Sequence, residues 1–240
     1  MAVPIVASGV AVLMIAGGLA CSNGAPGQGE TGIDQTRQLT YLALGDSYTI
    51  GQGVDVADRW PVQLVERLRS EGIRMADPEI MARSRWTANR LAVQLNVAAP
   101  DGPYDLVTLM IGVNDQFGGL PVEGYRDEFA ALLSRAVALA DDRPSHVIVV
   151  SIPDWGVTPF ADGRKRDRIA MEIDLFNQVN REEAERARAR YVDVTPISRE
   201  AATEPSLLAA DGLHPSGRMY ARWLDLIVGP AREVLTPSGQ

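Results

Sequence analysis

Four polar side chains in this sequence have the types and spacing needed for nucleophilic attack on a carbonyl group. They are Ser47, Asn114, Asp211 and His214. A serine hydroxyl attacks only when a base removes its proton, and the base works best when a third group orients it. Asp211 stands three residues before His214, a spacing that in a turn places both side chains together. The carboxylate can then hold one imidazole nitrogen while the other faces outward.

Each of these residues also has an ordinary structural use. Ser47 and the preceding Asp46 could cap a helix that follows them. Asn114 tolerates left-handed backbone angles and forms side-chain turns. Asp211 could form an Asx-turn that leaves His214 on the surface. The sequence of each motif alone leaves these alternatives open.

The scarcity of histidine narrows the choice of base. The chain contains two histidines, and His146 begins an apolar run in which a structural role is expected. If a histidine acts as base, it is therefore His214. Asn114 adds a neutral amide donor, which can face a developing oxyanion without acting as an acid.

Short apolar runs alternate with amphipathic stretches from residue 39 onward. The predicted strands are Leu39–Leu44, Glu79–Ala82, Leu106–Ile111, His146–Ile152 and Tyr191–Val194. The predicted helices are Trp60–Ser70, Thr87–Asn96, Gly124–Ala140, Arg166–Arg188 and Ser216–Val228. This alternation predicts an α/β domain of three layers, α/β/α, around a five-stranded parallel sheet. Such sheets bind ligands beyond the carboxyl ends of their strands, where Ser47 and Asn114 stand.

Composition and charge limit the classes of partner. The chain has 240 residues, of which 46% are hydrophobic and 22% charged, as expected for one globular domain behind a leader. Its formal net charge is -8, and Lys165 is its only lysine. Without a basic surface to follow a phosphate backbone, we expect no nucleic-acid partner. The run Arg164-Lys165-Arg166 is interpreted as a solvated loop or a helix start.

Residues 1–20 have the features of a signal peptide. They carry no charge, and their apolar core from Val10 to Leu19 is short for a membrane span. Small residues at Gly18 and Ala20 fit a signal-peptidase site. We therefore expect export, followed by a flexible tether over residues 21–38 and a folded domain over residues 39–240.

Cys21 directly follows the predicted signal peptide and is the only cysteine. A single cysteine excludes an intramolecular disulfide and a cysteine-based zinc cluster. Its position resembles that of the lipidated cysteine of bacterial lipoproteins, which implies membrane tethering through a lipid on Cys21. The alternative is a secreted protein in which Cys21 is a free thiol.

The Gly-Asp-Ser block at Ser47, the Gly-Val-Asn-Asp block at Asn114 and the Asp-x-x-His block ending at His214 occur in one chain. Together they resemble the SGNH hydrolase family, also called GDSL esterases and lipases. The resemblance covers the chain from Leu39 to the last predicted helix. It implies a flavodoxin-like sheet in the order 2-1-3-4-5, with Ser47 as the nucleophile.

The resemblance also implies a reaction, the hydrolysis of carboxylic esters through an acyl-enzyme. His214 takes the hydroxyl proton of Ser47, and Asp211 fixes the imidazole tautomer. The substrates expected are short acyl esters, acetylated glycans or lipid esters, and no cofactor is required. The oxyanion hole comprises the Ser47 amide, the Asn114 side chain and the amide of a residue after strand two. Where the family has glycine at this last position, the sequence has Arg85.

Arg85 supports an alternative from another class, a catalytically weakened protein that binds glycans or lipids at the cell envelope. A nucleotide-binding protein is disfavoured because the loop after the first strand lacks Gly-x-Gly-x-x-Gly and a P-loop lysine. Asp46, Asp115 and Asp211 are carboxylates without a ligand-spaced histidine cluster, so no metal site is predicted. The segment 151–160, with Trp155 and Phe160, is either a rigid loop over the sheet edge or an apolar substrate wall.

Overall fold

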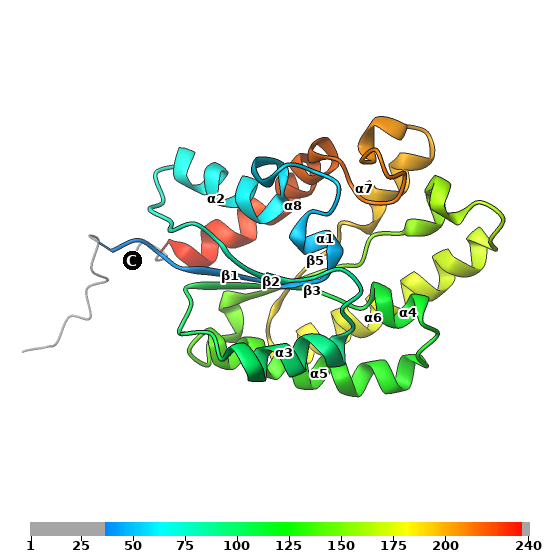
Figure 1. Ribbon diagram of the computed structural model, residues 1–240. Helices are drawn as coiled ribbons and strands as arrows, with labels where there is room; N and C mark the ends of the chain where they lie inside the picture. The colour runs from blue at the N-terminus through cyan, green and yellow to red at the C-terminus, as the bar shows by residue number, and fades with distance from the viewer. Residues whose placement is uncertain (1–36, 237–240) are drawn as a thin grey trace, which may run out of the picture. The chain divides into compact units, whose positions relative to one another are not determined.

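The computed structural model describes residues 37–236, so the predicted signal peptide and Cys21 lie outside the described residues. Five strands form one parallel sheet in the order β2-β1-β3-β4-β5 (Figure 1). They are β1 (Tyr41–Gly45), β2 (Glu79–Ala82), β3 (Leu106–Met110), β4 (Val147–Val150) and β5 (Arg190–Val192). The five-stranded parallel sheet and the strand order implied by the resemblance are confirmed.

Helices cover both faces of this sheet (Figure 1). Helices α2 (Trp60–Ser70) and α8 (Gly217–Leu235) lie on one face, and α3 (Ala88–Ala98), α5 (Val122–Leu139) and α6 (Arg166–Ala187) lie on the other. Shorter helices are α1 (Ser47–Ile50), α4 (Val113–Phe117) and α7 (Thr195–Arg199). The predicted three-layer α/β/α architecture is confirmed. Within residues 37–236, no helix combines the length and apolar content that a bilayer crossing requires.

The core explains why the central strands are continuous apolar runs. All residues of β1, β3 and β4 are buried, because both faces of a parallel sheet are covered by helices. Trp60 of α2 and Trp223 of α8 are fully buried on the same side of the sheet. The sheet is therefore packed between two helical layers, and residues that follow the carboxyl ends of its strands are held in fixed positions.

Most predicted elements differ from the structure by one or more residues at an end, and two of these differences have identifiable reasons. The last helix was expected to end at Val228, before Gly229-Pro230, but α8 continues through Pro230 to Leu235. Its apolar stripe continues with Ala231 and Leu235, both buried, and this packing outweighs the hydrogen bond that proline removes. The fourth strand begins at Val147, because His146 ends a single 3-10 turn.

Candidate active site

Ser47 begins α1 immediately after β1, and the local sequence dictates this turn. A Cβ atom on Gly45 would overlap the Thr49 hydroxyl and lie 2.5 Å from the Met110 carbonyl oxygen, so only glycine fits there. Asp46 caps α1, since its carboxylate accepts a hydrogen bond of 3.0 Å from the Tyr48 amide. Because Asp46 does the capping, the Ser47 hydroxyl has no hydrogen-bond partner within residues 37–236.

His214 and Asp211 form the pair that their spacing predicts. The imidazole Nδ1 lies 2.6 Å from Asp211 Oδ2, and the other carboxylate oxygen accepts hydrogen bonds from the amides of Leu213 and His214 at 3.0 and 2.9 Å. Burial acts to raise the pKa of Asp211, but these hydrogen bonds outweigh it and hold the pKa below the ordinary value of aspartate. The carboxylate thus stays charged and orients the ring, and Nε2 is left as the free nitrogen.

The imidazole of His214 is also held by packing. Its ring lies 5.5 Å from that of Tyr48, centroid to centroid, and its exposed fraction is only 5%. Tyr48 is fixed in turn, because its carbonyl oxygen accepts a hydrogen bond of 2.9 Å from the Tyr220 hydroxyl. The histidine is therefore oriented from two sides, by Asp211 and by Tyr48.

Asn114 is the second residue of α4, directly beyond β3. Gly112 precedes it with φ +122°, and a Cβ atom there would overlap the Tyr125 hydroxyl, so this position requires glycine. The Asn114 side-chain nitrogen donates a hydrogen bond of 2.9 Å to the Trp86 carbonyl oxygen. That nitrogen carries a second hydrogen, which remains for a ligand.

Arg85 has the backbone conformation that glycine prefers. It is the third residue of a turn closed by a hydrogen bond of 3.2 Å from the Trp86 amide to the Arg83 carbonyl oxygen, and its φ is +67°. Positive φ at this turn position is the usual reason for glycine. The chain path after β2 is therefore of the kind a glycine would adopt, although the side chain is an exposed arginine.

The candidate residues from these four segments meet at one cleft. Ser47, Arg85, Asn114 and His214 line a cavity of about 570 Å³, and Asp211 supports His214 from outside its lining. The other lining residues are Tyr48, Gln52, Ser84, Thr87, Val113, Phe117, Trp155, Phe160 and Leu213. The segment 151–160 therefore contributes to the cleft wall. Phe117 was not singled out from the sequence, although it lies one helical turn after Asn114.

The three aspartates considered as metal ligands have separate structural tasks. Asp46 caps α1, Asp211 holds His214, and Asp115 accepts hydrogen bonds of 3.1 and 3.3 Å from the Ala88 amide at the start of α3. Burial raises the pKa of Asp46 to about 7, with the nearby charge of Asp115 adding to the shift. Burial likewise raises the pKa of Asp115 to about 6. Across residues 37–236, no group of three or more His, Cys, Asp or Glu side chains is arranged to hold a metal ion.

His146 lies at the opposite edge of the sheet. It precedes β4, and its Nδ1 is 2.8 Å from the carbonyl oxygen of Asp105, which precedes β3. Both residues are at the amino ends of their strands, whereas the cleft lies at the carboxyl ends. Of the two histidines, only His214 lines the cleft.

Several solved structures share this fold. The chain matches TesA at 22% identity with a TM-score of 0.63, covering 82% of this chain and 99% of that one. It matches the psychrotrophic esterase EstA from Pseudoalteromonas sp. at 17% identity with a TM-score of 0.62, covering 81% of this chain and 97% of that one. It matches an acetyl xylan esterase from Geobacillus stearothermophilus at 19% identity with a TM-score of 0.60, covering 83% of this chain and 97% of that one. At these identities the likeness establishes the fold. A search of curated proteins gave no match.

A sequence model of the GDSL-like lipase/acylhydrolase family matches residues 43–222, a range that begins in β1 and ends in α8. The matched range includes Ser47, Asn114 and the Asp211–His214 pair. The chain therefore belongs to the GDSL-like lipase/acylhydrolase family, and it is an SGNH-type hydrolase.

Proposed function

We propose that this protein hydrolyses carboxylic esters with Ser47 as the nucleophile, His214 as the general base and Asp211 as the residue that orients the base. The observation that carries the proposal is the convergence of Ser47 and His214 on one cleft, with Asp211 2.6 Å from the imidazole nitrogen that faces away from it. An unbonded hydroxyl, a base with one free nitrogen and a charged carboxylate are the parts that acyl transfer requires.

The reaction follows from the chemistry of these groups. His214 Nε2 takes the proton as Ser47 Oγ attacks the ester carbonyl, and Asp211 stabilises the imidazolium that forms. The imidazolium then gives this proton to the leaving alcohol, and an acyl-enzyme remains. Water, deprotonated by His214, attacks the acyl-enzyme. The imidazolium then gives this proton to Ser47 Oγ as the bond to the acyl group breaks, which releases the acid and restores both residues.

The negative charge of the tetrahedral intermediate needs donors that are fixed before the reaction. We assign them as the amide of Ser47, the side-chain nitrogen of Asn114 and the amide of Arg85. The hydrogen bond from Asn114 to the Trp86 carbonyl supports this assignment, because it fixes the asparagine side chain. It also ties the asparagine to the turn that contains Arg85.

A panel of nitrophenyl esters with acyl chains of increasing length tests the proposal. We expect hydrolysis of at least one ester and its loss after treatment with a serine-directed phosphonate. The chain length that is hydrolysed fastest distinguishes short acyl from lipid-like substrates. Hydrolysis of none of them would favour the alternative of an envelope protein that binds glycans or lipids without turning them over.

Arg85→Gly is expected to change the turnover of neutral esters by less than about threefold, because the backbone already has the conformation of a glycine. Loss of one oxyanion donor costs on the order of 3 kcal/mol, or about a hundredfold in rate, so an impaired hole is easy to distinguish from an intact one. The measurement is kcat on a neutral nitrophenyl ester for both proteins. A gain approaching a hundredfold in the variant would mean that arginine had displaced the donor.

We further propose that the protein is exported and anchored by a lipid on Cys21. The sequence of residues 1–21 supports this proposal, since the apolar leader ends directly before the cysteine. When made in a bacterial host, the wild type should partition into the detergent phase and carry the added mass of a diacylglyceryl group. The Cys21→Ser variant should lack this mass and be released from the membrane into the aqueous phase. A wild-type product of unmodified mass in the aqueous phase would leave simple secretion as the answer.

A further inference from the structure

Three aromatic side chains separate the catalytic cleft from a second groove. Phe117, Trp155 and Phe160, called here the aromatic wall, have ring centroids 5.4 to 6.3 Å apart. All three line the cleft that contains Ser47, and Phe117 and Trp155 also line the groove on the other side. A substrate group that passes the wall would therefore extend from the cleft into the groove.

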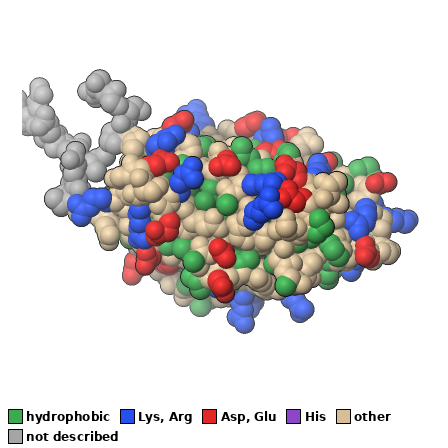
Figure 2. All heavy atoms as spheres, turned by 90° about the horizontal axis from the view of Figure 1, so that it is seen from above, with side chains coloured by type: hydrophobic (Ala, Val, Ile, Leu, Met, Phe, Trp, Pro, Cys, Tyr) green, Lys and Arg blue, Asp and Glu red, His purple; other side chains and the backbone are tan. Residues whose placement is uncertain are grey.

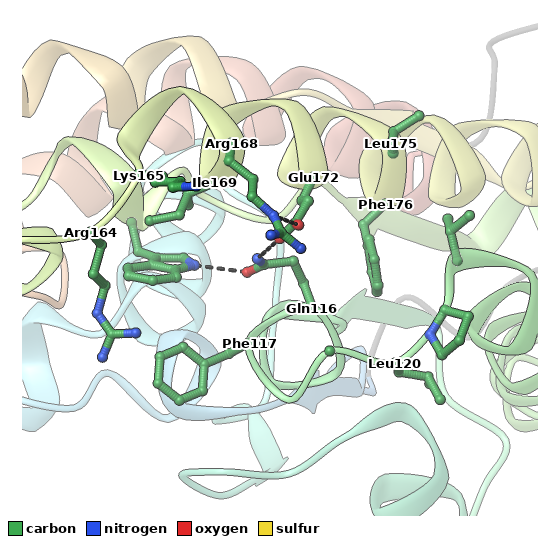
Figure 3. Close-up of a pocket in the computed structure, with 14 residues that line it drawn as sticks. Gln116, Phe117, Leu120, Arg164, Lys165, Arg168, Ile169, Glu172, Leu175 and Phe176 are labelled. Carbon is green, nitrogen blue, oxygen red and sulfur yellow. Dashed lines mark hydrogen bonds and ion pairs between the residues drawn. The ribbon is translucent and has the colours of Figure 1, made fainter.

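The second groove combines an apolar lining with cationic side chains (Figure 3). It has a volume of about 540 Å³, and its apolar lining includes Leu120, Leu175 and Phe176. Arg164 and Lys165 also line it. Such a groove suits a molecule that is partly apolar and carries a negative charge.

Hydrogen bonds fix the indole of Trp155 and engage both oxygens of the groove's carboxylate, Glu172. Trp155 Nε1 donates to Gln116 at 2.8 Å, and Gln116 donates to Glu172 at 2.7 Å (Figure 3). Arg168 Nε donates to the other oxygen of Glu172 at 2.7 Å. Glu172 is bonded to Arg168 and Gln116, and no hydrogen bond or ion pair joins it to Arg164.

The guanidinium of Arg164 is held by ring faces alone. Its central carbon lies 5.2 Å from the ring centroid of Phe117, 5.4 Å from that of Trp155 and 5.5 Å from that of Phe160. These cation–π contacts bias its position but fill none of its five N–H donors. Within residues 37–236, its side chain makes no hydrogen bond and no ion pair.

Most other arginines of this acidic protein are paired with carboxylates. Neighbouring examples are Arg166 with Asp162 and Arg168 with Glu172. Figure 2 shows the same pattern on one face of the molecule, where Lys and Arg side chains lie beside Asp and Glu. Arg164 differs from these two neighbours, because its guanidinium lies against the aromatic wall and has no carboxylate partner within residues 37–236.

We propose that Arg164 is a specificity-determining residue that binds a carboxylate or phosphate group of the ester substrate in the groove beside the aromatic wall. A planar guanidinium with free donors binds such oxyanions through two parallel hydrogen bonds. Lys165 adds positive charge at the same groove, and the apolar lining contacts the alkyl part of the substrate. The preferred substrates are thus esters of anionic, partly apolar molecules. This inference rests on the proposed function.

Matched esters that differ only in a terminal carboxylate test the proposal. The pairs are 4-nitrophenyl hexanoate with mono-4-nitrophenyl adipate, and 4-nitrophenyl octanoate with mono-4-nitrophenyl suberate. In at least one pair, wild type should prefer the anionic ester, and Arg164→Gln should reduce this preference about tenfold, mainly through KM. Arg164→Lys should retain part of the preference because it keeps the charge. Equal changes for the neutral and the anionic ester in both pairs would overturn the proposal.

A binding measurement separates failure of this inference from failure of the proposed function. Calorimetry with hexanoate and with hexyl phosphate, neither of which is a carboxylic ester, reports binding without turnover and distinguishes carboxylate from phosphate recognition. We expect Arg164→Gln to weaken at least one of them about tenfold, and Arg90→Gln, an exposed arginine outside both cavities, to weaken neither. If wild type hydrolyses no ester but binds these anions through Arg164, the proposed function fails and the anion site remains. If binding is independent of Arg164, the site is refuted whatever the activity.

Discussion

Ser47→Ala is expected to reduce ester hydrolysis by about 10⁴-fold or more while the protein stays folded. In the proposed mechanism the serine supplies the atom that forms the acyl-enzyme, and Ser47 lines the same cleft as His214. The Ser47 hydroxyl has no hydrogen-bond partner within residues 37–236, so its removal leaves no buried group unsatisfied. The free energy of unfolding should change by less than about 1 kcal/mol.

The measurement compares kcat on a neutral nitrophenyl ester with the unfolding midpoint in urea. Ser70→Ala is a matched control, because Ser70 is an exposed serine at the end of α2 with a local hydrogen bond to the Arg67 carbonyl. It should keep the activity of the wild type. If Ser47→Ala kept more than a trace of turnover, Ser47 would not be the nucleophile. If activity and the folded state were lost together, the variant would not test whether Ser47 is the nucleophile. Covalent labelling of wild-type Ser47 by a phosphonate would then test this role.

The strands and long helices could be predicted because their signals are local or periodic. β2 and α2 have the predicted bounds, and α6 differs by one residue at its end. Errors occurred where tertiary packing outweighs a local signal. Pro230 is a strong local stop, but the buried stripe of α8 carries the helix past it. Such packing depends on residues that are far apart in the sequence.

The candidate residues could be predicted where a residue type and its spacing indicate one step of the proposed reaction. Ser47, Asn114, Asp211 and His214 fall into this class, and the structure brings them to one cleft, with Asp211 in contact through His214. The positive φ of Arg85 could not be predicted from its residue type, because arginine rarely adopts that conformation.

The cationic groove was missed for a different reason. Arg164 belongs to a run interpreted as a solvated loop or a helix start, and it does lie in the loop before α6. Its contacts come from Trp155 and Phe160, which precede it closely in the chain, and from Phe117 on a separate segment. No spacing rule along the chain connects Phe117 with the segment 155–164, so only the folded structure reveals that the guanidinium faces three rings.

Asp211→Asn is expected to lower kcat on the order of 10⁴-fold. The Asn oxygen can still accept the Leu213 and His214 amides, so the turn should form as in the wild type. The Asn nitrogen, however, would face Nδ1 as a donor and favour the tautomer whose proton is on Nε2. That tautomer cannot take a proton from Ser47, and no carboxylate remains to stabilise the imidazolium.

The pH dependence separates this catalytic role from a structural one. Wild-type kcat/KM should fall on acidification, since His214 accepts a proton only while it is neutral.

The free energy of unfolding should depend on pH through Asp211. Because the pKa of Asp211 is lowered in the folded protein, its stabilising contribution is present above the ordinary carboxyl pKa and is lost as the pH falls through the lowered value. The difference in urea midpoint between wild type and Asp211→Asn should therefore be largest near about pH 7 and shrink toward about pH 3. A large loss of kcat without this narrowing would mean that Asp211 does not carry its charge in the folded state, and a kcat close to that of the wild type would remove Asp211 from the triad.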